Sequence, residues 1–364
     1  MKRIIEFFRN QPPGRLITLG FFLVIMVGAL LLLTPLARRP GVDVRFVDAL
    51  FTSTSAVCVT GLIAIDTYDT FSVFGRAVVA LLIQVGGLGV TSVGAGLILA
   101  AGKKFSFKSR LMIKEGLNVD SFKGVVRLVK SVLLMTFCFE LVGAVLSFLV
   151  FIQDYPPLHA LGNSVFHSIA AFNNSGFDVL GGLQNLIPYR NDVLLNLTTC
   201  GLIIFGGIGF LVILDVLKNR FHFRKLALHS KVVITTSIFL IVVGTVILKL
   251  TDDVTWLGAF FHSVSARTAG FSTYPLGTFS NAGLFALTLL MFIGASPGST
   301  GGGIKTSTFF TLVQSMRSAL TKRHFGAFRR SLPRETLSKA YLITLLSLCV
   351  VCTGTLLVSA LEPH

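Results

Sequence analysis

Residues 51–62 read Phe-Thr-Ser-Thr-Ser-Ala-Val-Cys-Val-Thr-Gly-Leu, an apolar stretch too short to cross a membrane that ends in small polar residues and a glycine. The pattern returns at residues 166–177 (Phe-His-Ser-Ile-Ala-Ala-Phe-Asn-Asn-Ser-Gly-Phe) and at residues 261–271 (Phe-His-Ser-Val-Ser-Ala-Arg-Thr-Ala-Gly-Phe). The first two copies are in register from phenylalanine to glycine, and the third is one residue shorter. Three copies of one pattern predict a repeated structural unit.

The chain around these copies has the composition of an integral membrane protein. Of its 364 residues, 53% are hydrophobic and only 13% are charged. Apolar segments are expected to cross the bilayer at residues 16–37, 72–101, 125–152, 190–217, 231–250, 281–316 and 339–361. Each short stretch lies between two of these segments, which predicts a unit of helix, re-entrant segment and helix.

Positive charge gathers in alternate connections. The chain has 32 Lys and Arg against 16 Asp and Glu, a formal net charge of +16. Of these cations, 24 lie in the N-terminus and in the connections over residues 103–130, 218–231 and 317–339, whereas most acids lie in the other connections. The positive-inside rule therefore places the N-terminus and the basic connections in the cytoplasm. The charge indicates membrane topology, and no nucleic-acid partner is expected.

The three short copies have the features of a cation pore. Non-helical backbone at membrane depth is tolerated only where it is buried in protein or lines a water-filled cavity. The short helix would direct its partially negative end at the pore, and the strand after it would offer carbonyl oxygens in place of a hydration shell. Glycine permits the backbone dihedral angles that this needs. For any single copy, a tight turn between helices is the alternative.

The candidate filter residues close each copy: Val59, Thr60, Gly61, Asn174, Ser175, Gly176, Thr268, Ala269 and Gly270. Their backbone carbonyls would bind a cation in place of its hydration shell.

The apolar segment over 281–316 is interrupted at residues 294–306 by Gly-Ala-Ser-Pro-Gly-Ser-Thr-Gly-Gly-Gly-Ile-Lys-Thr. In a helix each Gly costs about 1 kcal/mol and Pro about 3 kcal/mol relative to Ala, so the sequence predicts a broken helix. A phosphate-binding P-loop is excluded because Ile304 stands where its second glycine is required. The candidate gate residues are Gly294, Pro297, Gly298, Ser299, Thr300, Gly301, Gly302, Gly303 and Lys305. A kink that serves helix packing is the alternative.

The expected fold class is an all-α polytopic membrane protein built from helix–pore loop–helix repeats. The repeats would cover residues 1–104, 105–218 and 219–322, the last with its second helix broken at 294–303. Residues 323–364 would supply only the first helix of a fourth repeat, so three and a half repeats are expected. A further pore loop and helix take roughly 50–80 residues, and we therefore expect the sequence to be a fragment.

Four other residues invite hypotheses. His167 and His262 occupy the same place in two copies, where capping or packing is favoured over metal binding. Glu140 lies in a spanning segment and is either an ion or proton relay or is paired internally. Arg267 is expected to point back into the protein, toward Asp178. No convergent nucleophile, acid–base or metal groups are evident, so an enzyme is not expected.

These motifs together resemble the Trk/Ktr/HKT superfamily of potassium transporters, and within it the KtrB-type membrane subunit. The resemblance covers essentially the whole chain and rests on residues 55–62, 171–177, 267–271 and 296–306, with the glycine-rich starts of the second helices at 86–89 and 206–209. It implies a central pseudo-fourfold pore, with Gly61, Gly176 and Gly270 as filter glycines and an intramembrane gating loop over 294–303. It also implies potassium uptake across a bacterial plasma membrane, often sodium-stimulated, with K⁺ at the filter carbonyls and Na⁺ as a second candidate ion.

The resemblance also implies a homodimer in the lipid bilayer. It further implies docking of a cytosolic nucleotide-binding ring subunit of the KtrA or TrkA type, so that nucleotide acts only through that partner. The alternative function is an alternating-access secondary cation transporter, which predicts paired helix interruptions in two halves of the chain. The sequence shows three re-entrant segments and one broken helix, which favours the pore.

Overall fold

The structure is a computed structural model of the chain, and it describes residues 11–100, 111–113, 115, 124–321, 326–328, 330–331 and 333–362. Much of the basic sequence expected in the cytoplasm, including residues 2–9, 103–110 and 322–325, lies outside these described residues. The same is true of the expected repeat boundaries after residues 104 and 322. The division into repeats therefore stays a prediction.

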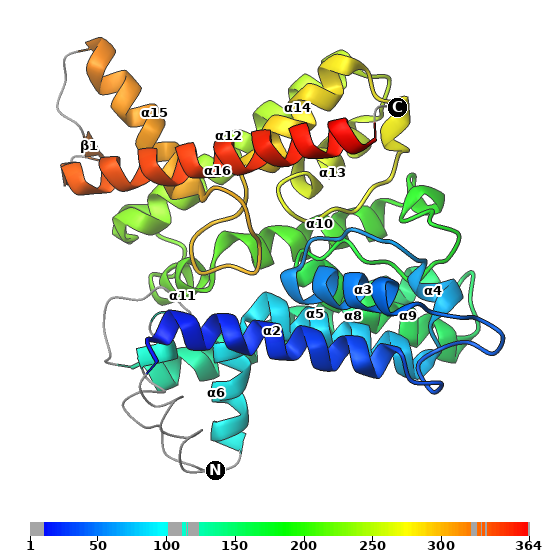
Figure 1. The fold of residues 1–364 in the computed structure, drawn as a ribbon. Helices are drawn as coiled ribbons and strands as arrows, with labels where there is room; N and C mark the ends of the chain where they lie inside the picture. The colour runs from blue at the N-terminus through cyan, green and yellow to red at the C-terminus, as the bar shows by residue number, and fades with distance from the viewer. Residues whose placement is uncertain are drawn as a thin grey trace.

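The described chain is almost wholly helical, and its helices form three successive groups followed by a last long helix (Figure 1). The first group is α2 (Pro13–Leu32), α3 (Phe46–Cys58), α4 (Thr67–Thr70), α5 (Val73–Leu88) and α6 (Val90–Ala100). The second is α8 (Val125–Phe151), α9 (Pro157–Phe172), η1 (Ile187–Tyr189), α10 (Val193–Ile208), α11 (Phe210–Lys218) and η2 (Phe223–Lys225). The third is α12 (Leu228–Thr251), α13 (Trp256–Ser265), η3 (Leu276–Thr278), α14 (Asn281–Phe292) and α15 (Thr306–Thr321). The strands β1 (Gly326–Ala327) and β2 (Arg330–Ser331) and the helix α16 (Arg334–Leu361) complete the described elements.

Four described helices are long and apolar enough to cross a membrane, and they lie within α2, α8, α12 and α16. The pairs α5–α6 and α10–α11 meet the same criteria together but bend by 100° and 94°. In Figure 1, α6 turns sharply away from α5. The segment over 281–316 is divided into α14, a loop and α15. The interpretation of a single broken helix is therefore wrong, because the second long helix of every group is interrupted.

The breaks lie at Gly89 and Gly209, whose φ angles are 80° and 96°. A side chain is strained at such angles, and glycine is not. The glycine-rich stretches 86–89 and 206–209 therefore stand at the ends of α5 and α10 and not at helix starts.

Each short helix is fixed within its group by the same contact. A serine of the short helix donates a hydrogen bond to a backbone carbonyl of the preceding long helix: Ser53 Oγ to Ile25 O (2.7 Å), Ser168 Oγ to Glu140 O (2.6 Å) and Ser263 Oγ to Ile241 O (2.8 Å). A glycine of that long helix faces both the serine and a leucine of the next long helix, in the sets Gly28–Ser53–Leu82, Gly143–Ser168–Leu202 and Gly244–Ser263–Leu290. A Cβ atom on any of these glycines would lie 2.4 or 2.5 Å from the serine Oγ. The three helices approach this closely because the residue is glycine.

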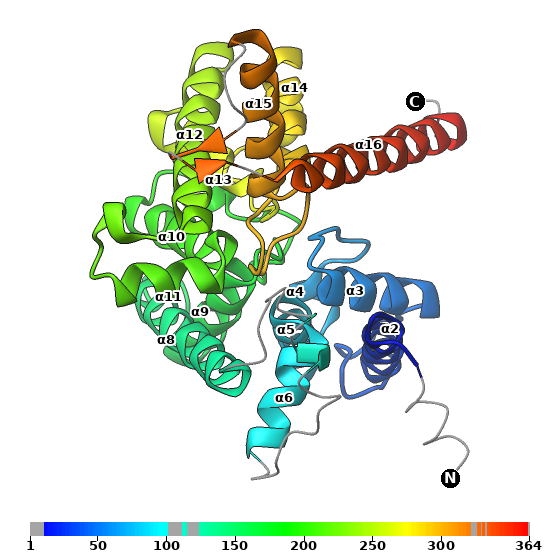
Figure 2. The ribbon, with the colours of Figure 1, turned by 90° about the vertical axis from the view of Figure 1, so that its left-hand side faces the viewer.

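The largest apolar core joins the first two groups to the third. It includes Leu82, Phe172, Leu202, Phe261 and Phe271, all at most 7% exposed. In contrast, α16 contacts α15 and extends beyond the rest of the body (Figure 2). None of its most apolar window is buried. The core therefore surrounds the short helices α3, α9 and α13, and it positions the segments that follow them.

Candidate functional site

The three glycine-ended segments, which follow α3, α9 and α13, meet in space. A Cβ atom on Gly61 would lie 2.7 Å from Ser175 O, and one on Gly176 would lie 2.6 Å from Ala269 O. A Cβ atom on Gly270 would in turn lie 3.5 Å from Gly176 Cα. The backbone of each segment thus packs on the backbone of another, with no room for a side chain at Gly61 or Gly176.

The three segments also share one backbone conformation. The glycines have φ angles of 74°, 71° and 82°, and Val59, Asn174 and Thr268, two residues earlier, have φ angles of 55°, 56° and 87°. Positive φ is uncommon for residues other than glycine and is strained for β-branched ones such as valine and threonine. The same strained conformation at three equivalent places indicates that the surrounding packing imposes it.

Polar side chains donate hydrogen bonds to a backbone carbonyl at the C-terminal end of each segment. Ser55 Oγ donates to Leu62 O (2.7 Å), and Ser265 Oγ donates to Phe271 O (2.5 Å). The second segment has Ala170 at this position, and there Asn185 Nδ2 donates to Gly176 O (3.3 Å). Asn185 was not singled out from the sequence, because it lies in a connection and bonds across the fold. Its Oδ1 also accepts from the backbone N–H of Ser272 in the third group (3.0 Å).

Most backbone carbonyl oxygens within the three glycine-ended segments accept no hydrogen bond from the described residues. Within the part of the chain that the structure describes, no hydrogen bond reaches the backbone oxygens of residues 59–61, 174–175 and 268–270. Asn174, Ser175 and Ala269 are buried, whereas Thr60 and Gly270 are exposed, so the set borders accessible space and an ion can reach it. The arrangement can bind a cation by replacing its hydration shell.

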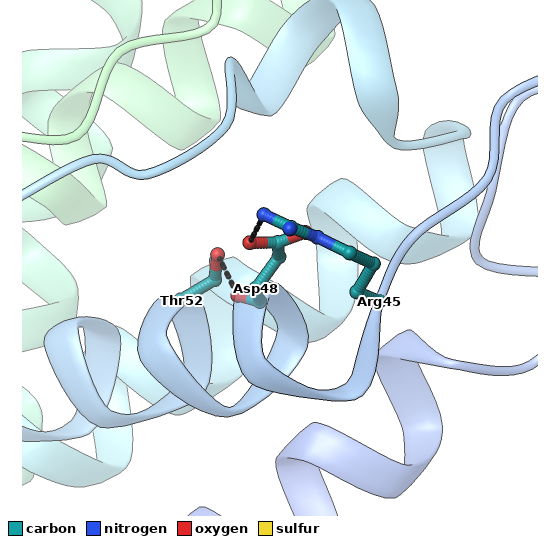
Figure 3. Close-up of polar contacts among 3 residues, drawn as sticks. All are labelled: Arg45, Asp48 and Thr52. Atoms are coloured by element: carbon teal, nitrogen blue, oxygen red, sulfur yellow. Dashed lines mark hydrogen bonds and ion pairs between the residues drawn. The ribbon is translucent and has the colours of Figure 1, made fainter.

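A short polar cluster lies at the N-terminal end of α3 (Figure 3). The Arg45 guanidinium donates to both carboxylate oxygens of Asp48, with Nε–Oδ2 at 2.8 Å and Nη2–Oδ1 at 3.0 Å. Thr52 Oγ1 donates to the backbone carbonyl of Asp48 (2.8 Å). Asp48 lies in the first turn, where a negative charge favours the helix dipole. The cluster fixes the start of a helix whose carbonyl end meets the first segment.

All candidate gate residues lie in the loop between α14 and α15 or at its ends. The loop touches two of the glycine-ended segments. Asn174 Nδ2 donates to Thr300 Oγ1 (2.7 Å), and a Cβ atom on Gly301 would lie 2.4 Å from Thr268 Oγ1. Lys305 Nζ donates to Gly301 O (2.8 Å), so this cation folds back on its own loop. The structure therefore places the predicted gate against the predicted filter.

The two histidines are buried, each 3% exposed. His167 Nε2 lies 2.8 Å from Thr199 Oγ1. His262 Nε2 has no hydrogen-bond partner among the described residues, and its ring packs on Phe279 at 4.9 Å between centroids. Both contacts agree with the packing role that the sequence favours. The described residues contain no group of three His, Cys, Asp or Glu that could hold a metal ion.

Glu140 is paired internally. Its Oε1 accepts from Asn173 Nδ2 (3.2 Å), which also donates to Gln84 Oε1 (2.8 Å). The three side chains come from α8, the end of α9 and α5, and join the first two groups behind the second segment. A relay role for Glu140 stays untested.

The expected ion pair between Arg267 and Asp178 is wrong. Arg267 is 9% exposed, as expected for a side chain turned into the protein, but among the described residues it forms no ion pair and its Nε has no hydrogen-bond partner. Asp178 instead turns back on its own connection, where its Oδ1 accepts from the backbone N–H of Leu180 (3.1 Å). Burial raises the pKa of the Asp178 carboxyl to about 6.

Known proteins resemble this chain along most of its length. A family model described as TrkH, cation transport protein, matches residues 21–251 and 223–362. The chain is 36% identical over 366 residues to the Ktr system potassium uptake protein B of Bacillus subtilis (strain 168), covering 97% of this chain and 81% of that protein. It is also 36% identical over 370 residues to the potassium/sodium uptake protein NtpJ of Enterococcus hirae, covering 98% of this chain and 81% of that protein.

A solved structure has the same fold. The potassium transporter TrkH from Vibrio parahaemolyticus superposes with a TM-score of 0.73 at 18% sequence identity, over 97% of this chain and 73% of that one. The likeness confirms the helical membrane fold expected from the sequence.

Proposed function

This chain belongs to the TrkH family of cation transport proteins, and from that membership we propose that it is the ion-conducting membrane subunit of a Ktr-type potassium uptake system. Relatives named for potassium uptake by a Ktr system and for potassium/sodium uptake support K⁺ as the transported ion and Na⁺ as a second one. The subunit would move ions down their electrochemical gradient without covalent chemistry.

One observation carries this proposal: the backbone carbonyls of residues 59–61, 174–175 and 268–270 have no hydrogen-bond partner among the described residues, and they lie where three backbone segments meet. A filter of this kind needs no charged side chain, because carbonyl dipoles replace the hydration shell. The C-terminal ends of α3, α9 and α13 add partial negative charge beside the same place. Together these groups favour a dehydrated monovalent cation.

The loop between α14 and α15 is proposed as the gate of this pore. It carries Gly298 and Gly303 at φ angles of 66° and 72°, so its backbone takes conformations that a helix cannot. Its contacts with Asn174 and Thr268 support a role in obstructing an ion that leaves the filter. Alternating access is less well supported, since the helix breaks recur in three groups and not in two matched halves.

The cellular setting is proposed on sequence and relatives together. The distribution of Lys and Arg supports a cytoplasmic N-terminus in a bacterial plasma membrane. Relatives named as parts of a Ktr system support a multi-component assembly. In that assembly we expect a membrane homodimer on a cytosolic nucleotide-binding ring subunit, with nucleotide bound by the ring.

Rubidium uptake in cells that lack potassium uptake systems tests the proposal, with the ring subunit co-expressed. The variant Gly176→Ala places a methyl group 2.6 Å from Ala269 O at a positive φ angle. It is expected to abolish uptake while the protein stays in the membrane. Gly277→Ala is the matched control, since a Cβ atom there meets nothing within 4 Å. Wild-type uptake by Gly176→Ala would contradict the proposal.

A further inference from the structure

We infer that the gating loop is held closed by a latch on the broken helix α10–α11, and that Thr300 connects this latch to the filter. The latch comprises the backbone of Gly206, Gly207 and Phe210, the backbone of loop residues 296–300, and the side chain of Thr300. The inference rests on the proposed function, because it assigns a regulating contact to the same pore.

The backbone part of the latch completes the broken helix. The break at Gly209 removes the helical partners of nearby peptide groups. The loop replaces them: Ser296 N–H donates to Gly207 O (2.9 Å), Thr300 N–H donates to Gly206 O (3.1 Å), and Phe210 N–H donates to Gly298 O (2.9 Å). These three backbone hydrogen bonds attach the loop to the helix ends at the α10–α11 break.

A comparison with the break in the first group shows that docking of a loop is specific to the α10–α11 break. Gly89 has φ 80° and its helix pair bends by 100°, close to the values at Gly209. In the described chain, no hydrogen bond from another segment reaches the backbone of residues 86–90. A Cβ atom on Gly89 would meet only Thr91 Oγ1 at 4.0 Å, whereas one on Gly209 would lie 2.7 Å from Pro297 O. The same backbone break can therefore exist without a loop docked on it.

The side-chain part of the latch reaches the filter. Thr300 Oγ1 accepts from Asn174 Nδ2 (2.7 Å) and donates to Phe172 O (3.0 Å). Asn174 belongs to the second filter segment, and Phe172 is the last residue of α9. Thr300 is 7% exposed and Asn174 is 1% exposed, so both bonds are shielded from water. Movement of the loop away from α10 must break these bonds, and it therefore changes the support of the filter.

The hydroxyl of Thr300 is the group to remove. Thr300→Val keeps the shape of the side chain and loses both hydrogen bonds, so it shifts the equilibrium toward the open loop by about tenfold. Initial rubidium uptake per amount of membrane-inserted protein is expected to rise by up to that factor. Thr300→Ser keeps the hydroxyl and is expected to behave as the unaltered protein. Equal or lower uptake by Thr300→Val would overturn the latch.

A reversible cross-link tests the same contact without removing it. A Cβ atom on Gly207 would lie 3.8 Å from Ala295 Cβ, which is the mean separation of Cβ atoms in disulfides. The double variant Gly207→Cys/Ala295→Cys is expected to lose rubidium uptake on oxidation and to regain it on reduction. Each single variant is the control, and oxidation is expected to leave its uptake unchanged. Full cross-linking, measured by loss of thiol labelling, with unchanged uptake would overturn the inference.

The two proposals fail separately. If Gly176→Ala abolishes uptake while Thr300→Val and the cross-link leave it unchanged, the latch is refuted and the pore remains. If Gly176→Ala has no effect, the pore assignment itself is refuted.

Discussion

Gly143 offers a test of the packing that positions the second filter segment. A Cβ atom there would lie 2.4 Å from Ser168 Oγ and 2.6 and 2.8 Å from the methyl carbons of Leu202. The variant Gly143→Ala must displace Ser168, whose hydrogen bond to Glu140 O (2.6 Å) is worth about 1 kcal/mol. It must also press α8 away from α10, and overpacking of this kind costs about 1–3 kcal/mol. Alanine is more favourable than glycine in a helix by about 1 kcal/mol, which offsets part of this loss, so the expected destabilisation is about 1–3 kcal/mol.

Thermal unfolding of the purified protein in detergent measures this loss, with Gly201→Ala as the matched control. Gly201 lies in α10, and a Cβ atom there meets nothing within 4 Å. Because alanine favours helix over glycine by about 1 kcal/mol, the control is expected to raise the melting temperature. Gly143→Ala is expected to lower it by several degrees, and Gly143→Ala/Ser168→Ala to recover part of the loss. A melting temperature for Gly143→Ala equal to that of Gly201→Ala would refute the reasoning.

Two further predictions concern the connections outside the spanning helices. Because burial raises the pKa of Asp178 to about 6, the folded protein keeps a proton between about pH 4 and 6 that the unfolded chain has lost. The melting temperature is therefore expected to fall as pH rises through that range, and to fall less in Asp178→Asn; equal slopes would contradict this assignment. Asn185→Ala removes the amide that holds Gly176 O and is expected to lower rubidium uptake several-fold, whereas the exposed control Asn191→Ala is expected to leave uptake unchanged. Unchanged uptake in Asn185→Ala would show that this amide does not support the filter.

Two interpretations of the sequence were wrong. One applied a local signal, the clustered glycines, at only one of three places, and the other paired two side chains that lie far apart in the sequence. Three glycines in four residues at 86–89 and at 206–209 are the same signal that predicted the break at 294–303, and they mark breaks at Gly89 and Gly209. The pairing of Arg267 with Asp178 was based on opposite charge alone. In the structure the Asp178 carboxylate bonds its own connection, because a backbone N–H two residues away is available without ordering a second side chain.

The sequence alone determined the membrane class, the short helices and the glycine positions. These features depend on the length of apolar stretches and on the freedom of single backbone residues, which are properties of neighbouring residues. Only the tertiary structure decided that Gly61 meets Ser175, that Asn185 holds Gly176, and that Asn174 bonds Thr300, 126 residues further along the chain. Such contacts depend on how separate helices pack against one another. The 2.7 Å hydrogen bond between Asn174 and Thr300 needs both residues to be placed precisely by the surrounding helices, and the sequence pattern of either segment does not specify that placement.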